Sequence, residues 1–359
     1  MDRRHFLKTS AAAAAVSALP FKAAALPRWT SYEMTTRVEI AKTAGVTRAW
    51  IPVPAVDNGV WQKTLGNSWS GNATRAELAT DGKYGVTMLY AEWAPAVASP
   101  ALEITSRFSL RDRAVDLSAP RDKSIELSAS DRAFYTAPSE LIATDGIVKK
   151  TALSITKGAK SDVEKARAAY EWIVDNTFRD PKVRGCGLGD IKTMLETGNL
   201  GGKCADLNAL FVGLMRSVGV PARDIYGIRV AKSAYGYKSL GAGSENVTKA
   251  QHCRAEFFAS GYGWVPVDPA DVRKVVLEEP PGNLAVNDPK VVAARKRLFG
   301  SWEMNWLAYN MGADVRLPGS SGPALGYLMY VNAETGGQRL DQLDPDSMSY
   351  AITAWDVKA

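Results

Sequence analysis

Histidine and cysteine are scarce in this 359-residue chain, which holds two histidines and three cysteines. His5 lies in a basic amino-terminal stretch that is typical of a cleaved segment, so His252 is the one imidazole expected in the mature protein. The cysteines, Cys186, Cys204 and Cys253, form no C-x-x-C pair, and no H-E-x-x-H, calcium-binding, phosphate-binding or dinucleotide-binding motif occurs. We therefore expect no metal and no cofactor, and a general base would have to be His252.

Long apolar runs are also missing. The run from Ser10 to Pro20 has 11 residues, too few to cross about 30 Å of hydrocarbon. It follows Arg3-Arg4 and Phe6-Leu7-Lys8 and precedes three alanines that end at Ala25, a pattern typical of a twin-arginine export signal. We predict a signal peptide over 1–25, a periplasmic mature protein and no membrane-spanning segment in it; an uncleaved anchor is the weaker alternative.

An excess of charge of one sign is lacking once this signal is set aside. The chain holds 44 Lys and Arg against 38 Asp and Glu, and the signal contains four of the former and one of the latter. The mature chain therefore carries 40 and 37, a net charge of +3, with no concentrated basic stripe. We expect no nucleic-acid partner.

The first half of the mature chain is patterned as short strands. Apolar residues alternate with polar ones near residues 35–40, 84–90 and 102–110, with Ser106 as an exception, and turn residues separate the runs. This pattern predicts a β-sandwich domain over 26–140.

Helical spacing appears in the second half. Residues 161–178 and 204–218 are expected to be helices, the first opened by a Ser161–Glu164 capping box and the second ended by Gly219. Strands are expected at 224–230, 252–258 and 264–267, and the Gly-, Ser- and Lys-rich loop 231–250 could border a cleft.

These elements predict an α+β domain over 141–280. The remaining segment, 281–359, is irregular with strand-like runs at 325–331 and 349–355. It is expected to be a C-terminal extension that packs on that domain.

Cys204 stands at the start of the second predicted helix, after Gly201-Gly202-Lys203. A thiol at a helix N-terminus has a lowered pKa and is more nucleophilic. His252 begins a predicted strand and Asp268 ends the next one, 16 residues later. A hairpin between them would place imidazole and carboxylate side by side, as a base and its orienting group require. Each residue alone would more simply be a buried cysteine, a surface histidine and a turn aspartate.

Four sequence blocks between residues 201 and 270 resemble the transglutaminase-like superfamily. Gly202-Lys203-Cys204-Ala205-Asp206 resembles its G-x-C-x-D block, and 252–256 resembles its H-x-W-x-E block. Residues 263–269 resemble its G-W-x-x-x-D-P block, and 217–223 resembles the segment that ends its nucleophile helix. Two positions depart from the family pattern: Ala205 stands where Arg is frequent, and Arg254 where Trp is frequent.

The resemblance implies a papain-like α+β transglutaminase core preceded by a β-sandwich, with Cys204 as nucleophile, His252 as general base and Asp268 as the residue that orients it. The departures at Ala205 and Arg254 put the substrate preference in doubt more than this triad. The backbone N–H of Cys204 is the expected oxyanion donor, and Trp172 is a weak candidate for a second.

Four further residues are expected to support or line the site. Gly202 belongs to the glycine approach to Cys204, and Trp264 belongs to the G-W block. Asp206 is expected to cap the helix rather than act in catalysis. Glu256 lies on the same strand face as His252, where it would order the site, contact substrate or form an ordinary ion pair.

The odd number of cysteines suggests a disulfide in an oxidising compartment. Cys253 should point away from His252, because strand neighbours alternate faces. We hypothesise a Cys186–Cys253 disulfide that leaves Cys204 free, with a Cys186–Cys204 redox pair as the alternative.

Three functions remain open. A thiol hydrolase acting on peptide or amide bonds through a thioacyl-enzyme is favoured, because water always competes for that intermediate. A transamidase would use the same triad, and a peptide-binding scaffold without turnover is the third reading. The expected partner is a peptide or protein substrate; envelope proteins and peptidoglycan peptides are available in the periplasm.

Overall fold

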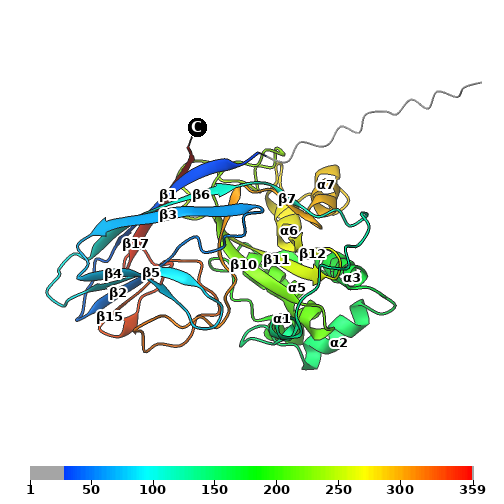
Figure 1. Ribbon diagram of the computed structural model, residues 1–359, viewed down its shortest axis with the longest axis horizontal. Helices are drawn as coiled ribbons and strands as arrows, with labels where there is room; N and C mark the ends of the chain where they lie inside the picture. Colours follow the sequence, from blue (N-terminus) through cyan, green and yellow to red (C-terminus); the bar gives the residue numbers. More distant parts are fainter. Residues whose placement is uncertain (1–27, 358–359) are drawn as a thin grey trace, which may run out of the picture.

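The computed structural model describes residues 28–357, so the predicted signal peptide lies outside the described residues. Two β-sheets lie face to face on one side of the molecule, and the labelled helices gather on the other side around a third sheet (Figure 1). This arrangement confirms the predicted α+β class with a strand-rich region ahead of the core.

The two stacked sheets form the sandwich. One contains, in spatial order, β17 (Ser349–Asp356), β1 (Thr30–Glu39), β6 (Ala101–Leu110) and β3 (Gln62–Gly71). The other contains β16 (Gln338–Arg339), β15 (Asn332–Thr335), β2 (Thr47–Pro52), β5 (Thr87–Trp93) and β4 (Arg75–Thr80).

Alternation of buried side chains explains how these strands pack. Along β6, Leu102 and Ile104 point into the sandwich core, and Phe108 continues the same alternation into the apolar cluster that contains Trp302 and Trp306. Ser106 occupies the same face and is also buried, but its hydroxyl donates a hydrogen bond of 2.6 Å to the Asn67 side chain on β3. The polar exception in the pattern is therefore satisfied inside the sheet.

The C-terminal segment corrects one prediction. The expectation that 281–359 packs on the catalytic domain holds for α7 (Pro289–Arg297), which contacts α6 (Pro269–Glu278). It also holds for β14 (Trp306–Asn310), which pairs with β10 (Ala222–Arg229). It is wrong for β15 and β17, because these strands pair with β2 and β1 and complete the two sandwich sheets. The predicted strand at 325–331 is also wrong: only Leu325 makes an isolated bridge, to Val315.

The third sheet carries the core of the second half. Its order is β12 (Gly263–Val267), β11 (Gln251–Ala259), β10 (Ala222–Arg229) and β14. Helix α5 (Cys204–Ser217) packs against β11 and β10, and its residues from Cys204 to Arg216 are all buried. The predicted helix at 204–218 and the three predicted strands are confirmed.

Other helices surround α5. Ser161 caps α3 (Asp162–Asn176) by accepting a hydrogen bond from the Glu164 backbone N–H, which is one half of the predicted capping box. The Glu164 carboxylate accepts from the Lys160 backbone N–H instead of that of Ser161. The remaining elements here are α1 (Ala129–Thr136), α2 (Gly146–Ile155), α3 (Asp162–Asn176), α4 (Ile191–Thr197), α6 (Pro269–Glu278) and the short strands β7 (Arg113–Ala114), β8 (Phe178–Arg179), β9 (Gly201–Gly202) and β13 (Ser301–Trp302).

Within residues 28–357, none of the helices has both the length and the apolar character needed to cross a membrane.

One buried carboxylate lacks compensation. Both side-chain oxygens of Asp224 on β10 are buried, and neither has a hydrogen-bond partner among the described residues. Burial raises the pKa of Asp224 from its ordinary 3.8 to about 8, although the positive charge of Arg216 partly opposes this. The folded protein therefore holds a proton here that the unfolded chain releases at lower pH.

We expect Asp224→Asn to stabilise the protein increasingly as the pH rises. A carboxyl whose pKa is higher in the folded state favours folding below the unfolded value and opposes it as the pH rises toward about 8. The gain in the free energy of unfolding should be small near pH 4 and reach about 1–3 kcal/mol near pH 8, measured by urea unfolding.

Asp346→Asn is the matched control, because Asp346 is exposed and its substitution should change stability by less than about 0.5 kcal/mol at either pH. A gain for Asp224→Asn that does not depend on pH would contradict the assignment of a raised pKa.

Candidate active site

Cys204 is the first residue of α5 and is only 3% exposed. The chain reaches it through β9, which runs parallel to β8 with Arg179 opposite Gly202. A β-carbon at Gly202 would lie 2.5 Å from that of Asp206, and one at Gly201 would lie 2.4 Å from the Phe178 ring. Gly202 is therefore required by the close approach of the chain to the helix start, whereas at Gly201 the exposed Phe178 ring can move aside.

Asp206 has the capping role that the sequence predicted. Its carboxylate accepts backbone N–H hydrogen bonds from Leu188 (3.0 Å), Gly189 (2.9 Å) and Lys203 (2.9 Å). It thus ties the loop before α4 to the first turn of α5 and fixes where Cys204 begins the helix.

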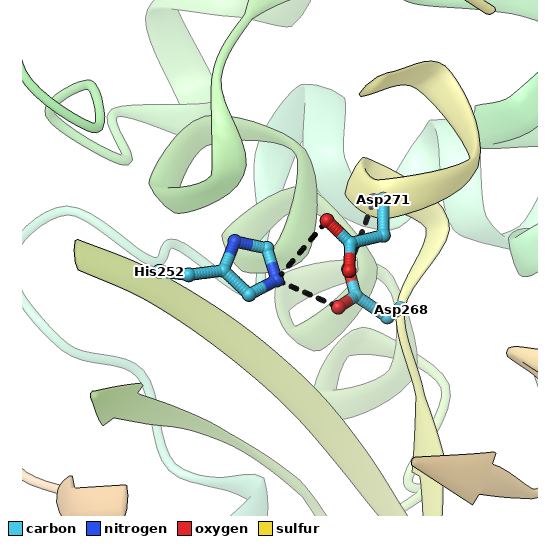
Figure 2. A group of neighbouring side chains, drawn as sticks. All are labelled: His252, Asp268 and Asp271. Atoms are coloured by element: carbon cyan, nitrogen blue, oxygen red, sulfur yellow. Dashed lines mark hydrogen bonds and ion pairs between the residues drawn. The ribbon is translucent and has the colours of Figure 1, made fainter. Parts of the chain in front are cut away.

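His252 lies at the start of β11 and Asp268 at the end of β12, as predicted. The Nε2 atom of His252 is 2.8 Å from an oxygen of Asp268 (Figure 2). The same atom is 3.4 Å from an oxygen of Asp271, which lies in the first turn of α6. Figure 2 shows the other ring nitrogen, Nδ1, turned away from both carboxylates. That nitrogen remains for an interaction with Cys204, whose thiol pKa the His252 ring helps to lower.

Two guanidinium groups compensate the two carboxylates. Arg229 on β10 pairs with Asp271 at 2.5 Å, and Arg254 on β11 approaches Asp268 at 3.5 Å. Burial alone would disfavour the ionised form of Asp271, but Arg229 and then His252 outweigh it and hold its carboxyl pKa below the ordinary value. Burial lowers the pKa of Arg254 to about 10, so it stays protonated at neutral pH.

The imidazole is poised to carry charge. Burial opposes protonation of His252, but the negative charges of Asp271 and Asp268 outweigh both burial and the nearby Arg229 and raise its pKa above the ordinary 6.5. His252, Asp268 and Asp271 offer donor atoms within 4.8 Å of one another, as a metal site would. However, both carboxylates already face guanidinium groups. Their negative charge is thus compensated without a metal ion, and the two carboxylates serve to hold the imidazole of His252.

All three cysteines meet at the start of α5. The Cys204 thiol interacts with the thiols of Cys186 and Cys253 as well as with His252, and all three interactions lower its pKa. These contacts, first those with Cys186 and Cys253 and then that with His252, outweigh burial and lower the pKa of Cys204 well below its ordinary value. The interaction with Cys204 and then burial raise the pKa of Cys186, whereas burial and then the interaction with Cys204 raise that of Cys253.

The hypothesised Cys186–Cys253 disulfide is not present, because all three cysteines are free. Cys253 does alternate with His252 along β11, but its face is the one that packs against α5. The thiol therefore points toward Cys204, which interacts with both of the residues expected to pair with each other.

Four residues that the sequence analysis missed hold the site in place. Asn208, one turn after Cys204, donates to the Cys253 carbonyl (2.8 Å) and to Asp268 (3.3 Å). Trp306 on β14 donates from its indole to the His252 carbonyl at 2.8 Å. Asp271 and Arg229 are the other two. A fully buried Asn within an apolar helix stripe was the one local signal available for this group.

The remaining predicted residues do not line the site. Glu256 is fully buried and pairs with Arg113 and Arg223, while Arg223 stacks over the Trp264 ring at 3.8 Å. Of the alternatives for Glu256, the structure therefore shows an ion pair that fastens β7 to the third sheet. Trp172 is half-buried in α3 against the core, and it is not among the described residues that border the cleft.

A cleft of about 810 Å³ opens over Cys204 and His252. The predicted loop 231–250 forms part of its wall through residues 241–250, and residues between 342 and 350 form another part. The cleft gives a ligand access to two side chains that are themselves almost fully buried.

We expect Asp271→Asn to raise the thiol pKa of Cys204 and to destabilise the fold. Loss of the carboxylate lowers the pKa of His252, so the thiolate loses part of its counter-charge, and Arg229 is left buried without its partner. Stability should fall by about 3 kcal/mol, measured by urea unfolding, while the pH profile of Cys204 alkylation moves to higher pH.

The control is Asp175→Asn, which removes a half-exposed partner of Arg295 and should cost less than about 1 kcal/mol. An alkylation profile of Asp271→Asn that matches the wild type would show that Asp271 has a packing role alone.

The comparisons agree with this geometry. The family model described as the transglutaminase-like superfamily core matches residues 149–269, and the TAT (twin-arginine translocation) pathway signal sequence matches residues 1–20. The latter match indicates export across the cytoplasmic membrane.

Similar proteins include one from Haemophilus influenzae, described as uncharacterized, which is 36% identical over 337 residues and covers 89% of each chain. The crystal structure of a proposed cysteine protease from Cytophaga hutchinsonii has a TM-score of 0.56 at 13% identity and covers 92% of each chain. The periplasmic domain of TgpA from Pseudomonas aeruginosa has a TM-score of 0.33 at 13% identity, over 68% of this chain and 88% of that one.

The segment matched by the family core contains Cys204, His252 and Asp268, and the similarity to the Haemophilus protein extends over most of the chain. The chain belongs to the transglutaminase-like superfamily.

Proposed function

We propose that this protein is a cysteine-dependent enzyme that transfers acyl groups from amide or peptide bonds, and that the usual acceptor is water. The observation that supports this most directly is the alignment of Cys204, His252 and Asp268. The thiol lies at a helix N-terminus, the His252 imidazole lowers its pKa, and a carboxylate holds one imidazole nitrogen at 2.8 Å.

The proposed reaction begins with transfer of the Cys204 proton to Nδ1 of His252. The thiolate attacks the carbonyl carbon, and His252 returns the proton to the leaving amine as the C–N bond breaks. Water then attacks the thioester, His252 takes its proton, and the carboxylic acid leaves as the Cys204 thiol is restored.

An oxyanion donor is available at the same point. The backbone N–H of Cys204 has no hydrogen-bond partner among residues 28–357, and it lies at the positive end of the α5 dipole. A carbonyl oxygen bound there would gain a donor as its negative charge develops.

Water is the favoured acceptor because the cleft of about 810 Å³ leaves the thioester open to solvent. The export signal supports a periplasmic site of action, and the expected substrates are therefore peptides or proteins of the cell envelope. A primary amine in place of water would make the same site a transamidase.

We expect the pH profile of iodoacetamide alkylation at Cys204 to have a midpoint well below about 8.5. His252→Ala should move it upward and slow alkylation near pH 7 by at least about tenfold, because the thiolate loses its imidazolium partner. Peptide mass spectrometry follows each thiol separately.

Cys186 and Cys253 provide controls within the same chain, since both have raised pKa values and should stay unmodified in both proteins. A midpoint at or above the ordinary value that is unaffected by His252→Ala would sink the proposal and favour a peptide-binding scaffold.

The acceptor can be tested without knowing the natural substrate. An activated aryl ester of an acylated amino acid should acylate Cys204, and the thioester then partitions between water and an added labelled primary amine. We expect the free acid to be the main product even with excess amine. A main product that is the labelled amide would instead identify a transamidase, and Cys204→Ala gives the background rate.

A further inference from the structure

The side chains that line the cleft carry charge of one sign. Six cationic residues border it, namely Arg179, Arg184, Lys203, Arg229, Lys249 and Lys274. Among the described residues of the lining there is no Asp or Glu. This contrasts with the nearly balanced charge of the whole mature chain.

Only part of this positive charge is compensated. Arg229 is paired with Asp271 beneath the cleft, and Arg179 and Lys274 share the single carboxylate of Glu278. Arg184 is paired with Asp341. The six cationic side chains therefore have three carboxylate partners in total, those of Asp271, Glu278 and Asp341.

The pairing of Arg184 is weak, and two lysines have none. Arg184 and Asp341 meet at 2.7 Å, but the two side chains are 61% and 45% exposed, where an ion pair contributes little. Lys203 and Lys249 make no ion pair with any carboxylate of residues 28–357. The cleft therefore keeps a net positive charge that a bound anion would neutralise.

These cations surround the reacting thiol from several elements. Lys203 immediately precedes Cys204, and Arg179 lies opposite Gly202 in the β8–β9 pair. Lys249 lies on the cleft loop three residues before His252. Lys274 lies one turn after Asp271 in α6, where burial and the like charge of Arg229 lower the pKa of its amine.

We infer that the cleft selects an anionic peptide, one that presents carboxylates close to the amide bond that reacts. A low-dielectric cleft with unpaired lysines concentrates anions and orients them. The carboxylates can come from acidic side chains or from a free peptide C-terminus. This inference rests on the proposed function, since it names the substrate class of the same site.

The test compares two alkylating agents of similar size at Cys204, anionic iodoacetate and neutral iodoacetamide. Both react with the thiolate, so the ratio of their rates cancels changes in thiol pKa and reports attraction of the anion. We expect the ratio to fall by about threefold or more in Lys249→Gln, to fall further in the Lys203→Gln, Lys249→Gln double variant, and to fall with added salt in the wild type.

Lys150→Gln is the matched control, because Lys150 is exposed on α2 and does not border the cleft. Its ratio should equal that of the wild type. An unchanged ratio in both cleft variants would overturn the inference. If iodoacetamide still reacts at a lowered pKa, the proposed function survives that result; if it does not, the proposed function itself fails.

Blocked hexapeptides distinguish the source of the carboxylate by their protection of Cys204 from iodoacetamide. Protection by a Glu-rich peptide with an amidated C-terminus identifies acidic side chains, and protection by a Gln-rich peptide with a free C-terminus identifies the terminal carboxylate. Protection by the amidated Gln-rich peptide that equals protection by both the Glu-rich peptide and the Gln-rich peptide with a free C-terminus overturns the inference. No protection by any of the three overturns it too, as does stronger protection by a Lys-rich peptide.

Discussion

Two carboxylates and two guanidinium groups lie buried around one imidazole, and their charges cancel while His252 is neutral. Any one of these charges without its partner would cost several kcal/mol in such an interior. Protonation of His252 adds a single positive charge, and the thiolate of Cys204 supplies the matching negative one. The site can thus form a thiolate–imidazolium pair while the buried carboxylates and guanidinium groups around it carry no net charge. The members come from β10, β11 and the β12–α6 junction, so the third sheet must be correctly registered before the charges balance.

Arg254 illustrates how this chain accommodates a departure from its family's usual pattern. A tryptophan is frequent at that position, whereas here a guanidinium lies 4.7 Å from the ring centre of Trp306 and 5.6 Å from that of Trp302. Both tryptophans belong to the segment after α7. The aromatic surface is therefore supplied by a different part of the chain, and the position gains a positive charge beside Asp268.

How much could be predicted from the sequence depends on how far apart along the chain the interacting residues lie. Helix α5, its neighbouring strands and the placement of Cys204, His252 and Asp268 were predictable, because glycine pairs, apolar spacing and family blocks are local signals. Arg229 and Asp271 meet across 42 residues, and no local pattern marks such a pair. The pairing of β17 with β1 joins the two ends of the chain, and β3 is too polar and exposed to show a strand pattern. The gathering of the three thiols depends on how α5 packs against β11, which alternation along the strand alone does not specify.

The last strand serves two parts of the molecule at once. β17 completes a sandwich sheet beside β1. Its Ile352 holds the cleft loop by accepting a hydrogen bond from the Val247 backbone N–H and by donating one to the Thr248 hydroxyl. Residues just before β17 form one cleft wall. Neither the sandwich sheet nor this wall of the cleft is complete until β17 is in place. Displacement of this one strand would therefore disturb a sandwich sheet and a wall of the cleft over Cys204 together.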